Sequence, residues 1–399
     1  MKGKKVLGYV MALVLATSLI SLMVSSQANA QAKEPIKIGV LGDLTSFLAN
    51  VVKGANEGIK LAVDEVGSVG GRRIELIFED DASSPDQTLD KARKLVERDH
   101  VALTIGPLNG GCAVAVAPYL DRMKSPNIQY VVQPDELAAM SKSMFLCSGT
   151  HRMNAYAAGM YAAQKLHYKT AVTFALDFAG TYGHINGFTE GFVENGGKII
   201  EKRWVPPTAT DFSAYILGLQ KADVAAVLVF GNTTVPFYQQ YAKVGKMPLI
   251  DVYSELDFPE NRNPLGEIPA KLGVTCCESW AYDEPGSESQ QFVSKYKEKF
   301  GVLPIHMALM GYDSAKIAIS ALERTKGDTS SDALIKALYQ TDMNTIYGKR
   351  SFSKDRLGVS NPRIMKPKSK DGGFTMEVVE RYKIKGELRG KEVVLTVIK

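Results

Sequence analysis

The sequence predicts an α/β protein in which two series of strands and helices follow one another. Short runs rich in β-branched residues alternate with longer segments of helical period, a pattern typical of repeated strand–helix units and a mostly parallel sheet. The composition agrees, because 45% of the 399 residues are hydrophobic and 23% are charged, as in ordinary globular proteins. No low-complexity linker separates the two series, which favours lobes joined by several short crossings.

The first series begins with a strand over 36–41 and a helix over 52–66, whose apolar residues fall on one face. A second strand is expected over 74–79. The next helix has a clear start, because Ser84 supplies an N-cap hydroxyl and Pro85 suits the first helical position. The series is completed by a strand over 101–105, a helix over 111–123 and a strand over 128–132.

The second series follows residue 149 and has the same alternation. Its helices are expected over 154–166, 184–195, 211–221 and 235–244, and its strands over 170–176, 198–204, 224–230, 249–253 and 274–279. Three further helical patterns cover 287–300, 307–322 and 331–339. The C-terminal stretches 374–383 and 392–398 alternate in the manner of antiparallel strands.

The start of the chain has the pattern of a secretory signal peptide. A basic start is followed by an uncharged apolar run over 6–24, and small residues at Ala28 and Ala30 form a cleavage site before Gln31. The alternative is an uncleaved anchor, since such a run is long enough to span a bilayer. No cysteine stands at the cleavage point, which argues against a lipid-anchored protein. We therefore expect a soluble mature chain in a bacterial periplasm.

The charge balance gives no support for a nucleic-acid partner. The chain has 48 Lys and Arg against 43 Asp and Glu, and three of the positive charges, at Lys2, Lys4 and Lys5, lie in the leader. The rest of the chain is nearly neutral, whereas phosphate binding needs basic side chains gathered on one face.

The cysteines and histidines predict neither a disulfide scaffold nor a metal site. Cys276 and Cys277 are adjacent in an expected strand and point to opposite faces, so buried thiols are the favoured interpretation. The alternative is a disulfide between Cys112 and Cys147. The five histidines show no metal-ligand spacing, and we expect no cofactor.

Motifs of the common catalytic machineries are also absent. The sequence contains no G-x-S-x-G, no phosphate-binding G-x-x-x-x-G-K-[ST] and no G-x-G-x-x-G after a strand. The interpretation is a binding protein and not an enzyme. A DNA-binding regulator would need a helix-turn-helix where this chain has its leader, and a membrane receptor would need a second anchor.

Several short motifs follow one another in a specific order. They are 36–40 in the first strand, Gly70-Gly71, 79–81, 84–92, Gly106-Pro107, 113–118, Asp177 with Tyr182-Gly183, Gly196-Gly197 and 211–213. Together they resemble the type I periplasmic solute-binding proteins of the Leu/Ile/Val-binding kind, the receptor components of ABC importers. The resemblance covers residues 35–399. It implies two doubly wound, parallel-sheet lobes, a ligand cleft that closes like a hinge, ABC permease subunits as partners, and a monomer.

The expected division of the chain has three parts. The signal peptide covers 1–30, the first lobe 31–148 plus 285–347, and the second lobe 149–284 plus 348–399.

The loop over 107–112 is the main candidate for ligand binding in the first lobe. Ligands of open α/β sheets bind beyond the carboxyl ends of strands, and this loop joins a strand to a helix start. The free amides of Asn109, Gly110, Gly111 and Cys112, with the positive end of the helix, would cradle a carboxylate. The alternative is a tight turn that serves packing alone.

The second lobe has three loops in equivalent positions. Tyr182 follows a strand and offers an aromatic wall with a hydroxyl, although a tyrosine beside glycine can be an ordinary turn residue. Thr233 and Glu255 follow the next two strand ends, so both are expected at the same mouth.

The resemblance also implies roles for particular residues. Gly110 stands where the family usually offers a serine to the ligand carboxylate, and Gln133 lies in a shortened loop in which Pro134 lacks an N–H. Glu255 matches the acid that binds an ammonium group, with Asp257 as the next candidate. These features predict a receptor for an amino acid or related carboxylate. The alternatives are an aromatic or other hydrophobic carboxylate, or presentation of the ligand to a sensor instead of an importer.

Overall fold

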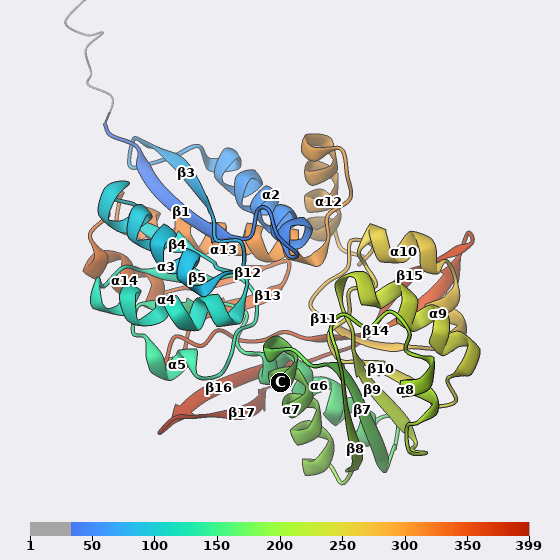
Figure 1. The fold of residues 1–399 in the computed structure, drawn as a ribbon. Coiled ribbons are helices and arrows are strands. Elements are labelled where there is room, and N and C mark those ends of the chain that lie inside the picture. The colour runs from blue at the N-terminus through green and yellow to red at the C-terminus, as the bar shows by residue number, and fades with distance from the viewer. Residues whose placement is uncertain (1–32, 399) are drawn as a thin grey trace, which may run out of the picture.

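The structure is a computed structural model that describes residues 33–398 and contains two α/β lobes side by side (Figure 1). The predicted signal peptide and its cleavage point lie outside the described residues. The two-lobed, parallel-sheet architecture predicted from the sequence is confirmed. Among the described residues, no helix combines the length and the apolar character needed to cross a membrane.

The first lobe contains a six-stranded sheet in the order β2-β3-β1-β4-β5-β6. Its strands are β1 (Ile36–Gly42), β2 (Ser68–Val69), β3 (Arg72–Asp80), β4 (Leu103–Ile105), β5 (Asn127–Gln129) and β6 (Met144–Leu146). Its helices are α2 (Ala49–Val66), α3 (Pro85–Arg93) with the π-turn η1 (Lys94–Arg98), α4 (Gly110–Arg122), α5 (Leu137–Met140), α12 (Ser287–Phe300), α13 (His306–Arg324) and α14 (Ser331–Tyr339). All pairs in this sheet are parallel except the short edge pair of β2 and β3.

The second lobe contains a seven-stranded sheet in the order β15-β14-β11-β10-β9-β7-β8. Its strands are β7 (Thr170–Leu176), β8 (Lys198–Val205), β9 (Val224–Leu228), β10 (Leu249–Asp251), β11 (Thr275–Glu278), β14 (Arg363–Lys370) and β15 (Gly373–Arg381). Its helices are α6 (His151–Gln164), α7 (Ala179–Glu194), α8 (Ser213–Leu217), the 3-10 turn η2 (Gly231–Thr233), α9 (Thr234–Val244), α10 (Pro259–Leu265) and α11 (Ile268–Leu272). The strands β14 and β15 extend the parallel part of the sheet in antiparallel fashion.

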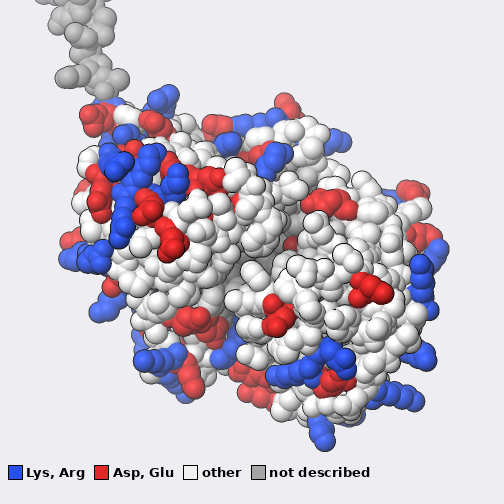
Figure 2. All heavy atoms as spheres, viewed as in Figure 1, with Lys and Arg blue, Asp and Glu red and all other residues white. Residues whose placement is uncertain are grey.

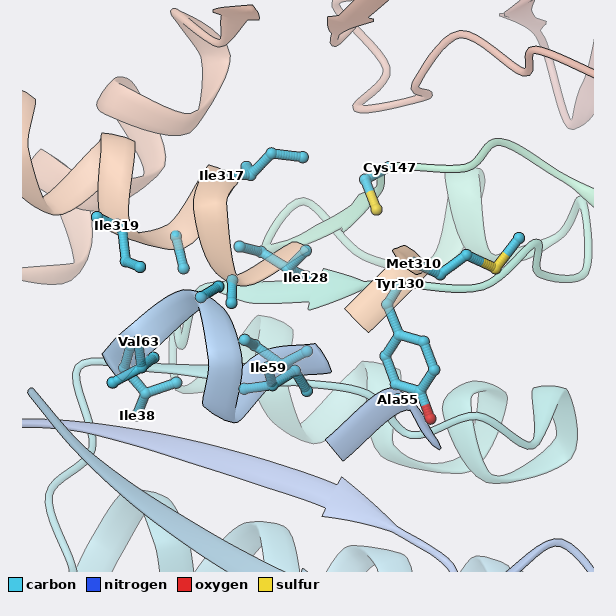
Figure 3. Close-up of a cluster of buried hydrophobic side chains, with 14 of the residues drawn as sticks. Ile38, Ala55, Ile59, Val63, Ile128, Tyr130, Cys147, Met310, Ile317 and Ile319 are labelled. Carbon is cyan, nitrogen blue, oxygen red and sulfur yellow. The ribbon is translucent and has the colours of Figure 1, made fainter. Parts of the chain in front are cut away.

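Helices α2 and α13 cover one face of the first sheet, and their apolar side chains form the centre of its core (Figure 3). Ile59 and Val63 of α2 lie in one cluster with Ile317 and Ile319 of α13, and all four are buried. The period-3.6 spacing of the apolar residues in 52–66, read from the sequence, produces this buried face.

The helix expected from His184 starts five residues earlier, at Ala179. The segment resembles a loop in sequence because it contains Gly180 and Gly183. In the structure Gly183 allows α7 to approach α6, since a Cβ at this position would lie 2.8 Å from the Cβ of His151. The glycine therefore serves helix packing and not a turn.

Several other element boundaries differ from the prediction. The helix expected over 211–221 contains only Ser213–Leu217, β5 ends at Gln129 and not at residue 132, and α6 begins at His151 and not at residue 154. The strand β14 was not predicted, because Pro367 and three lysines obscure its pattern. Pro367 is tolerated because it lies beyond the short β11, where β14 pairs only with β15.

The chain crosses between the lobes three times. The crossings lie between β6 and α6, between β11 and α12, and between the hairpin of β12 (Asp342–Thr345) with β13 (Gly348–Ser351) and strand β14. The lobe boundary expected between residues 347 and 348 falls in the turn of that hairpin. Arg363 joins two crossings, because its guanidinium donates to the carbonyl of Ile346 at 2.9 Å and pairs with Glu284 at 2.8 Å.

A C-terminal hairpin of β16 (Lys383–Arg389) and β17 (Glu392–Ile398) lies beneath the first lobe and reaches α6 of the second lobe (Figure 1). Val393 packs in a first-lobe cluster with Ala117 and Leu146, and Ile384 packs against Met153 of α6. The antiparallel character predicted for the C-terminal region is confirmed, although β15 and β17 belong to different sheets.

All four cysteines are buried and free, which agrees with the preferred interpretation from the sequence. The pair Cys112–Cys147 is therefore not formed in the structure.

Candidate functional site

The candidate site lies at the seam between the lobes, where loops from both sheets meet. The space-filling view shows this seam on the face of the molecule, with few charged side chains beside it (Figure 2). Helix α4 of the first lobe contacts α7 of the second, so the loops that precede these helices face the same region.

The first-lobe loop has the geometry of an anion cradle. Asn109 is the N-cap of α4, and its Oδ1 accepts a hydrogen bond from the amide of Gly111 at 2.9 Å. The first-turn amides of Gly110 and Cys112 have no acceptor among residues 33–398. These N–H groups, at the positive end of a helix of ordinary length, can bind a carboxylate oxygen.

The structure places Gly110 and Gln133 next to each other. A Cβ at position 110 would lie 2.9 Å from the ring of Pro134 and 3.5 Å from Oε1 of Gln133. Gln133 is fully buried, and its Nε2 donates to Oε1 of Gln129 at 2.9 Å and to the carbonyl of Leu108 at 3.2 Å. Its Oε1 has no hydrogen-bond partner among the described residues, so it can accept a hydrogen bond from a bound solute.

The side chain of Cys112 belongs to the core and not to the site. It packs near Ala113 and Val116 on the buried side of α4, and it is fully buried. Burial raises the pKa of its thiol to about 11, so the thiolate is not formed at neutral pH. Only the backbone amide of Cys112 can contribute to the cradle.

The second lobe contributes a buried carboxylate. Oε2 of Glu255 accepts a hydrogen bond from the amide of Gly231 at 2.7 Å, which ties the loop after β10 to the loop after β9. Burial raises the pKa of Glu255 to about 7, although the Gly231 amide lowers it. Thr233 lies in the same turn, where its hydroxyl donates to the carbonyl of Phe230 at 2.7 Å and stabilises the turn.

Three phenylalanines connect the lobes beside this carboxylate. Phe47, in the loop after β1, meets the ring of Phe178 edge-on across the seam, with the ring centroids 6.3 Å apart. Phe178 in turn contacts Phe230, at 5.7 Å, and Phe230 directly precedes Gly231. The aromatic wall that contacts the opposite lobe is thus Phe178.

Tyr182 occupies a different place. It is 41% exposed, its hydroxyl donates to Asp177, and its ring packs edge-on against Trp204 of the edge strand β8 at 4.8 Å. These contacts place Tyr182 in the first turn of α7, beside the edge strand β8, whereas Phe178 is the N-cap of that helix.

A row of buried aromatic and ionisable side chains lies behind Glu255. The imidazoles of His151 and His184 stack at 4.6 Å, and His184 lies 4.7 Å from the ring of Tyr253. Burial lowers the pKa of His184 to about 4 and holds that of His151 well below its usual range. Both imidazoles are therefore neutral at pH 7.

The pKa of His306 is raised, in contrast to those of His151 and His184. Its ring contacts that of Tyr253, and its Nδ1 lies 3.1 Å from Oδ1 of Asp257 and 3.6 Å from Oε2 of Glu278. Burial would lower the pKa of His306, but the charges of Glu278 and Asp257 raise it. Burial raises the pKa of Glu278. Asp257, the next candidate for an ammonium-binding acid, is thus engaged with His306.

Sequence reasoning did not find Phe47, Glu278 or His306. Phe178 and Phe230 follow strand ends. The rule that ligands bind beyond the carboxyl ends of strands, which pointed to Glu255, therefore applies to them as well. Phe47 and His306 had no local signal, because their partners lie far away in the sequence.

Comparisons with known proteins agree with this geometry. The profile of a family described as periplasmic binding protein matches residues 35–373. The chain belongs to the periplasmic binding protein family. The prediction of a type I solute-binding receptor of the Leu/Ile/Val-binding kind is thereby confirmed.

Individual members of the family resemble this periplasmic binding protein along nearly its whole length. Leu/Ile/Val-binding protein homolog 6 of Brucella melitensis is 22% identical over 376 residues, which are 91% of this chain and 95% of that protein. An ABC transporter substrate-binding protein from Sphaerobacter thermophilus is 27% identical, with a TM-score of 0.82 and coverage of 87% and 97%.

A second solved structure contains a ligand. It is a solute-binding protein of an ABC transporter from Rhodopseudomonas palustris, in complex with 3,4-dihydroxybenzoic acid. That protein is 27% identical to this one, with a TM-score of 0.77 and coverage of 88% of this chain and 97% of that chain.

Proposed function

We propose that this protein is the solute receptor of an ABC importer and binds an amino acid or related small carboxylate between its lobes. The proposal is supported by complementary chemical groups on the two lobes. The first lobe offers the helix-start amides near Asn109, and the second offers the buried carboxylate of Glu255. A solute with a carboxylate at one end and an ammonium group at the other fits both.

An aromatic carboxylate is the second candidate. Phe47, Phe178 and Phe230 form an aromatic wall next to Glu255, and flat rings pack well against such walls. The Rhodopseudomonas palustris relative, whose structure contains 3,4-dihydroxybenzoic acid, supports this candidate. For such a solute, Glu255 would accept a hydrogen bond from a ring hydroxyl and not from an ammonium group.

The affinities of the two candidate classes of solute should depend differently on Glu255. A thermal-shift screen over amino acids and benzoic acids selects the solute, because a ligand that binds only the folded state raises Tm. Calorimetric titration of Glu255→Gln then tests the contact. For a solute with an ammonium group we expect a loss of roughly 1.5–3 kcal/mol, or about tenfold to a hundredfold in affinity. A benzoic acid without a hydroxyl should bind Glu255→Gln as it binds the parent protein.

Glu377→Gln is the matched control for this experiment. Glu377 lies on β15, pairs with Lys368 at 3.2 Å on the surface, and takes no part in the candidate site. Equal losses in both variants would contradict a specific role for Glu255. Unchanged binding of an amino acid by Glu255→Gln would mean that the acid is wrongly assigned.

The first-lobe cradle is better tested by a substitution at Gly111 than by one at Gly110. A side chain at Gly110 would collide with Pro134, so its effect would not report on the ligand alone. A Cβ at Gly111 approaches only Oδ1 of Asn109, at 3.3 Å. Gly111→Ala should therefore weaken every carboxylate solute, with or without an amine, and leave the fold intact.

We further infer that the chain is exported, cleaved between Ala30 and Gln31, and acts as a monomer that docks on permease subunits without changing its ligand chemically. The basic start, the apolar run and the small residues before Gln31 support the cleavage. N-terminal sequencing of the protein from a periplasmic extract should begin at Gln31. Recovery of the full-length chain in the membrane fraction would contradict the inference.

A further inference from the structure

Three metal-ligating side chains from distant parts of the sequence converge behind the candidate site. Asp257 follows β10, Glu278 ends β11 and His306 begins α13. One ligand atom from each lies within 4.8 Å of the others. The shortest separations are 3.1 Å from Nδ1 of His306 to Asp257 and 3.6 Å from the same atom to Glu278.

Two atoms of this cluster are buried without a hydrogen-bond partner among the described residues. They are Oε2 of Glu278, which faces Nδ1 of His306 at 3.6 Å, and Nε2 of His306, which takes no part in that contact; their side chains are 2% and 0% exposed, and Oε2 of Glu278 is the one directed at the other ligands. Unpartnered polar atoms of this kind are costly in a protein interior unless a ligand, an ion or water satisfies them. The other polar atoms have partners. Nδ1 of His306 lies 3.1 Å from Oδ1 of Asp257, the other oxygen of Asp257 accepts from the backbone amide of His306 at 3.0 Å, and Oε1 of Glu278 accepts from the amide of Ser279. A bound ion would replace the proton between Nδ1 and Asp257.

The cluster also has an excess of acidic groups. Glu255 is buried two residues from Asp257, so three carboxyl groups surround one imidazole. In the part of the chain that the structure describes, no lysine or arginine forms an ion pair with any of these three acids. A cation other than a basic side chain would balance this charge.

We propose that Asp257, Glu278 and His306 form a binding site for a divalent first-row metal ion of the Zn²⁺ class. One imidazole nitrogen with two carboxylate oxygens is a ligand set that suits Zn²⁺ and its neighbours, whereas Ca²⁺ and Mg²⁺ require oxygen ligands alone. Three protein ligands leave a further position for water. The site goes beyond the proposed solute binding and does not depend on it.

The metal site would connect the two lobes. His306 begins α13, which packs on α2 in the first lobe, whereas Asp257 and Glu278 follow strands of the second sheet. An ion held by all three side chains therefore favours the arrangement in which the lobes are together.

The test uses the tag-free mature chain, treated with a chelator and then titrated with Zn²⁺ without any solute. We expect one Zn²⁺ per chain by calorimetry and elemental analysis, and a higher Tm in its presence. Co²⁺ should give the visible absorption of a site with a nitrogen ligand. Ca²⁺ and Mg²⁺ should bind at least about tenfold more weakly than Zn²⁺.

Glu278→Gln and His306→Gln should each weaken Zn²⁺ binding by about tenfold to a hundredfold or more. His100→Gln and His167→Gln are matched controls, because both histidines are exposed. Circular dichroism and solute binding identify a variant that has lost its fold, and Glu278→Gln keeps the proposal testable if His306→Gln is unstable.

The proposal is overturned if Zn²⁺ does not bind the parent chain, which would mean that protons alone neutralise the cluster. It is also overturned if Zn²⁺ binding survives Glu278→Gln and is lost in His100→Gln or His167→Gln. Solute binding is measured separately, so failure of the metal site is distinguishable from failure of the proposed function.

Discussion

His184 lies inside the second lobe with its Nδ1 3.0 Å from the carbonyl of Gly180, and its Nε2 has no partner among residues 33–398. A charged imidazole would be poorly accommodated there, and the neighbouring His151 would oppose a second charge. The folded protein therefore keeps the proton off both rings down to low pH, while the unfolded chain binds protons below about pH 6.5.

The first prediction is a pH dependence of stability that depends on His184. Its pKa is lowered to about 4, so its contribution to stability is complete above pH 6.5 and is lost as the pH falls toward 4. The free energy of unfolding should decrease in this window by at most about 1.4 kcal/mol per pH unit for this group. Denaturant titrations from pH 7.5 to 4 should give a smaller slope for His184→Gln than for the parent protein.

The parent protein must be compared with His184→Gln because other groups change the free energy of unfolding in the opposite direction as the pH falls. Burial raises the pKa of Asp81 and of Asp251 to about 6, so these acids favour the folded state as the pH falls. His100→Gln is the control, since His100 is exposed. If the slope of His184→Gln equals that of the parent, the buried imidazole does not control acid stability.

Single residues could be predicted from the sequence where neighbouring residues determine both their position and their chemical role. Asn109 stands directly before a helix and caps it, and Glu255 follows a strand end and accepts from the amide of Gly231 in the neighbouring loop, while its role toward a ligand stays a prediction. His306 was not predictable, because its partners lie 28 and 49 residues away in the sequence. The chemistry of His306 depends on long-range packing, which local spacing does not encode.

Glycines determine how closely helices approach in both lobes. In the first lobe, a Cβ at Gly58 of α2 would lie 1.9 Å from the carbonyl oxygen of Ala308, and one at Gly311 of α13 would lie 2.1 Å from that of Ala55. In the second lobe, Gly159 of α6 and Gly191 of α7 have the same relation to backbone atoms of the partner helix. Each helix pair therefore packs backbone against backbone.

The second prediction concerns the first of these helix pairs. Alanine favours a helix interior over glycine by about 1 kcal/mol, but at Gly58 the added methyl group collides with the backbone of α13. We expect Gly58→Ala to destabilise the protein by about 1–3 kcal/mol or more. Thermal and denaturant unfolding measure the change.

Gly54→Ala, on the same helix, is the matched control. Its Cβ would approach Cγ1 and Cδ1 of the Ile305 side chain, both at 2.9 Å, and the nearest backbone atom is at 4.0 Å, so a side chain can move to make room. The cost of that movement and the gain in helix propensity should nearly cancel. Equal destabilisation by the two variants would show that the loss arises in α2 itself and not from contact with α13.

The elements with strong periodicity were predicted well, and those shaped by packing were not. The apolar face of α2 and the N-cap of α3 at Ser84 have local causes, and both are present in the structure. The start of α7 was wrong because glycines that serve the contact with α6 look like turn residues. Strand β14 also gave no local signal of its pairing, because its partner β11 lies far away in the sequence: the paired Cys277 and Ile364 are 87 residues apart.

At the scale of the whole molecule, the arrangement of the lobes depends on few contacts across the seam. The three crossings and the hairpin of β16 and β17 lie at one side, where Arg152 bonds the carbonyl of Val393 at 2.5 Å and pairs with Asp135 at 3.2 Å. On the other side, Phe47 reaches from the first lobe to Phe178 of the second. Opening about a hinge at the crossings would break the contact of Phe47 with Phe178 and keep the contacts of Arg152.

The third prediction is that solute binding closes the lobes and that Phe47 stabilises the closed arrangement. Small-angle scattering should give a smaller radius of gyration at saturating solute, because the ligand groups lie on both lobes. Phe47 is 63% exposed, so its removal should disturb the first lobe little. An edge-on aromatic pair contributes about 0.5–1.5 kcal/mol, and Phe47→Ala should therefore weaken solute binding about twofold to tenfold.

Leu44→Ala is the control for this prediction, because Leu44 lies in the same loop and is 40% exposed. If the aromatic contact acts on closure, Phe47→Ala needs more solute to reach the same compact form, whereas Leu44→Ala follows the parent titration. An unchanged scattering profile at saturation would contradict the hinge itself. A parent-like affinity of Phe47→Ala, together with normal compaction, would instead mean that the amide cradle and Glu255 hold the lobes together without help from the aromatic pair.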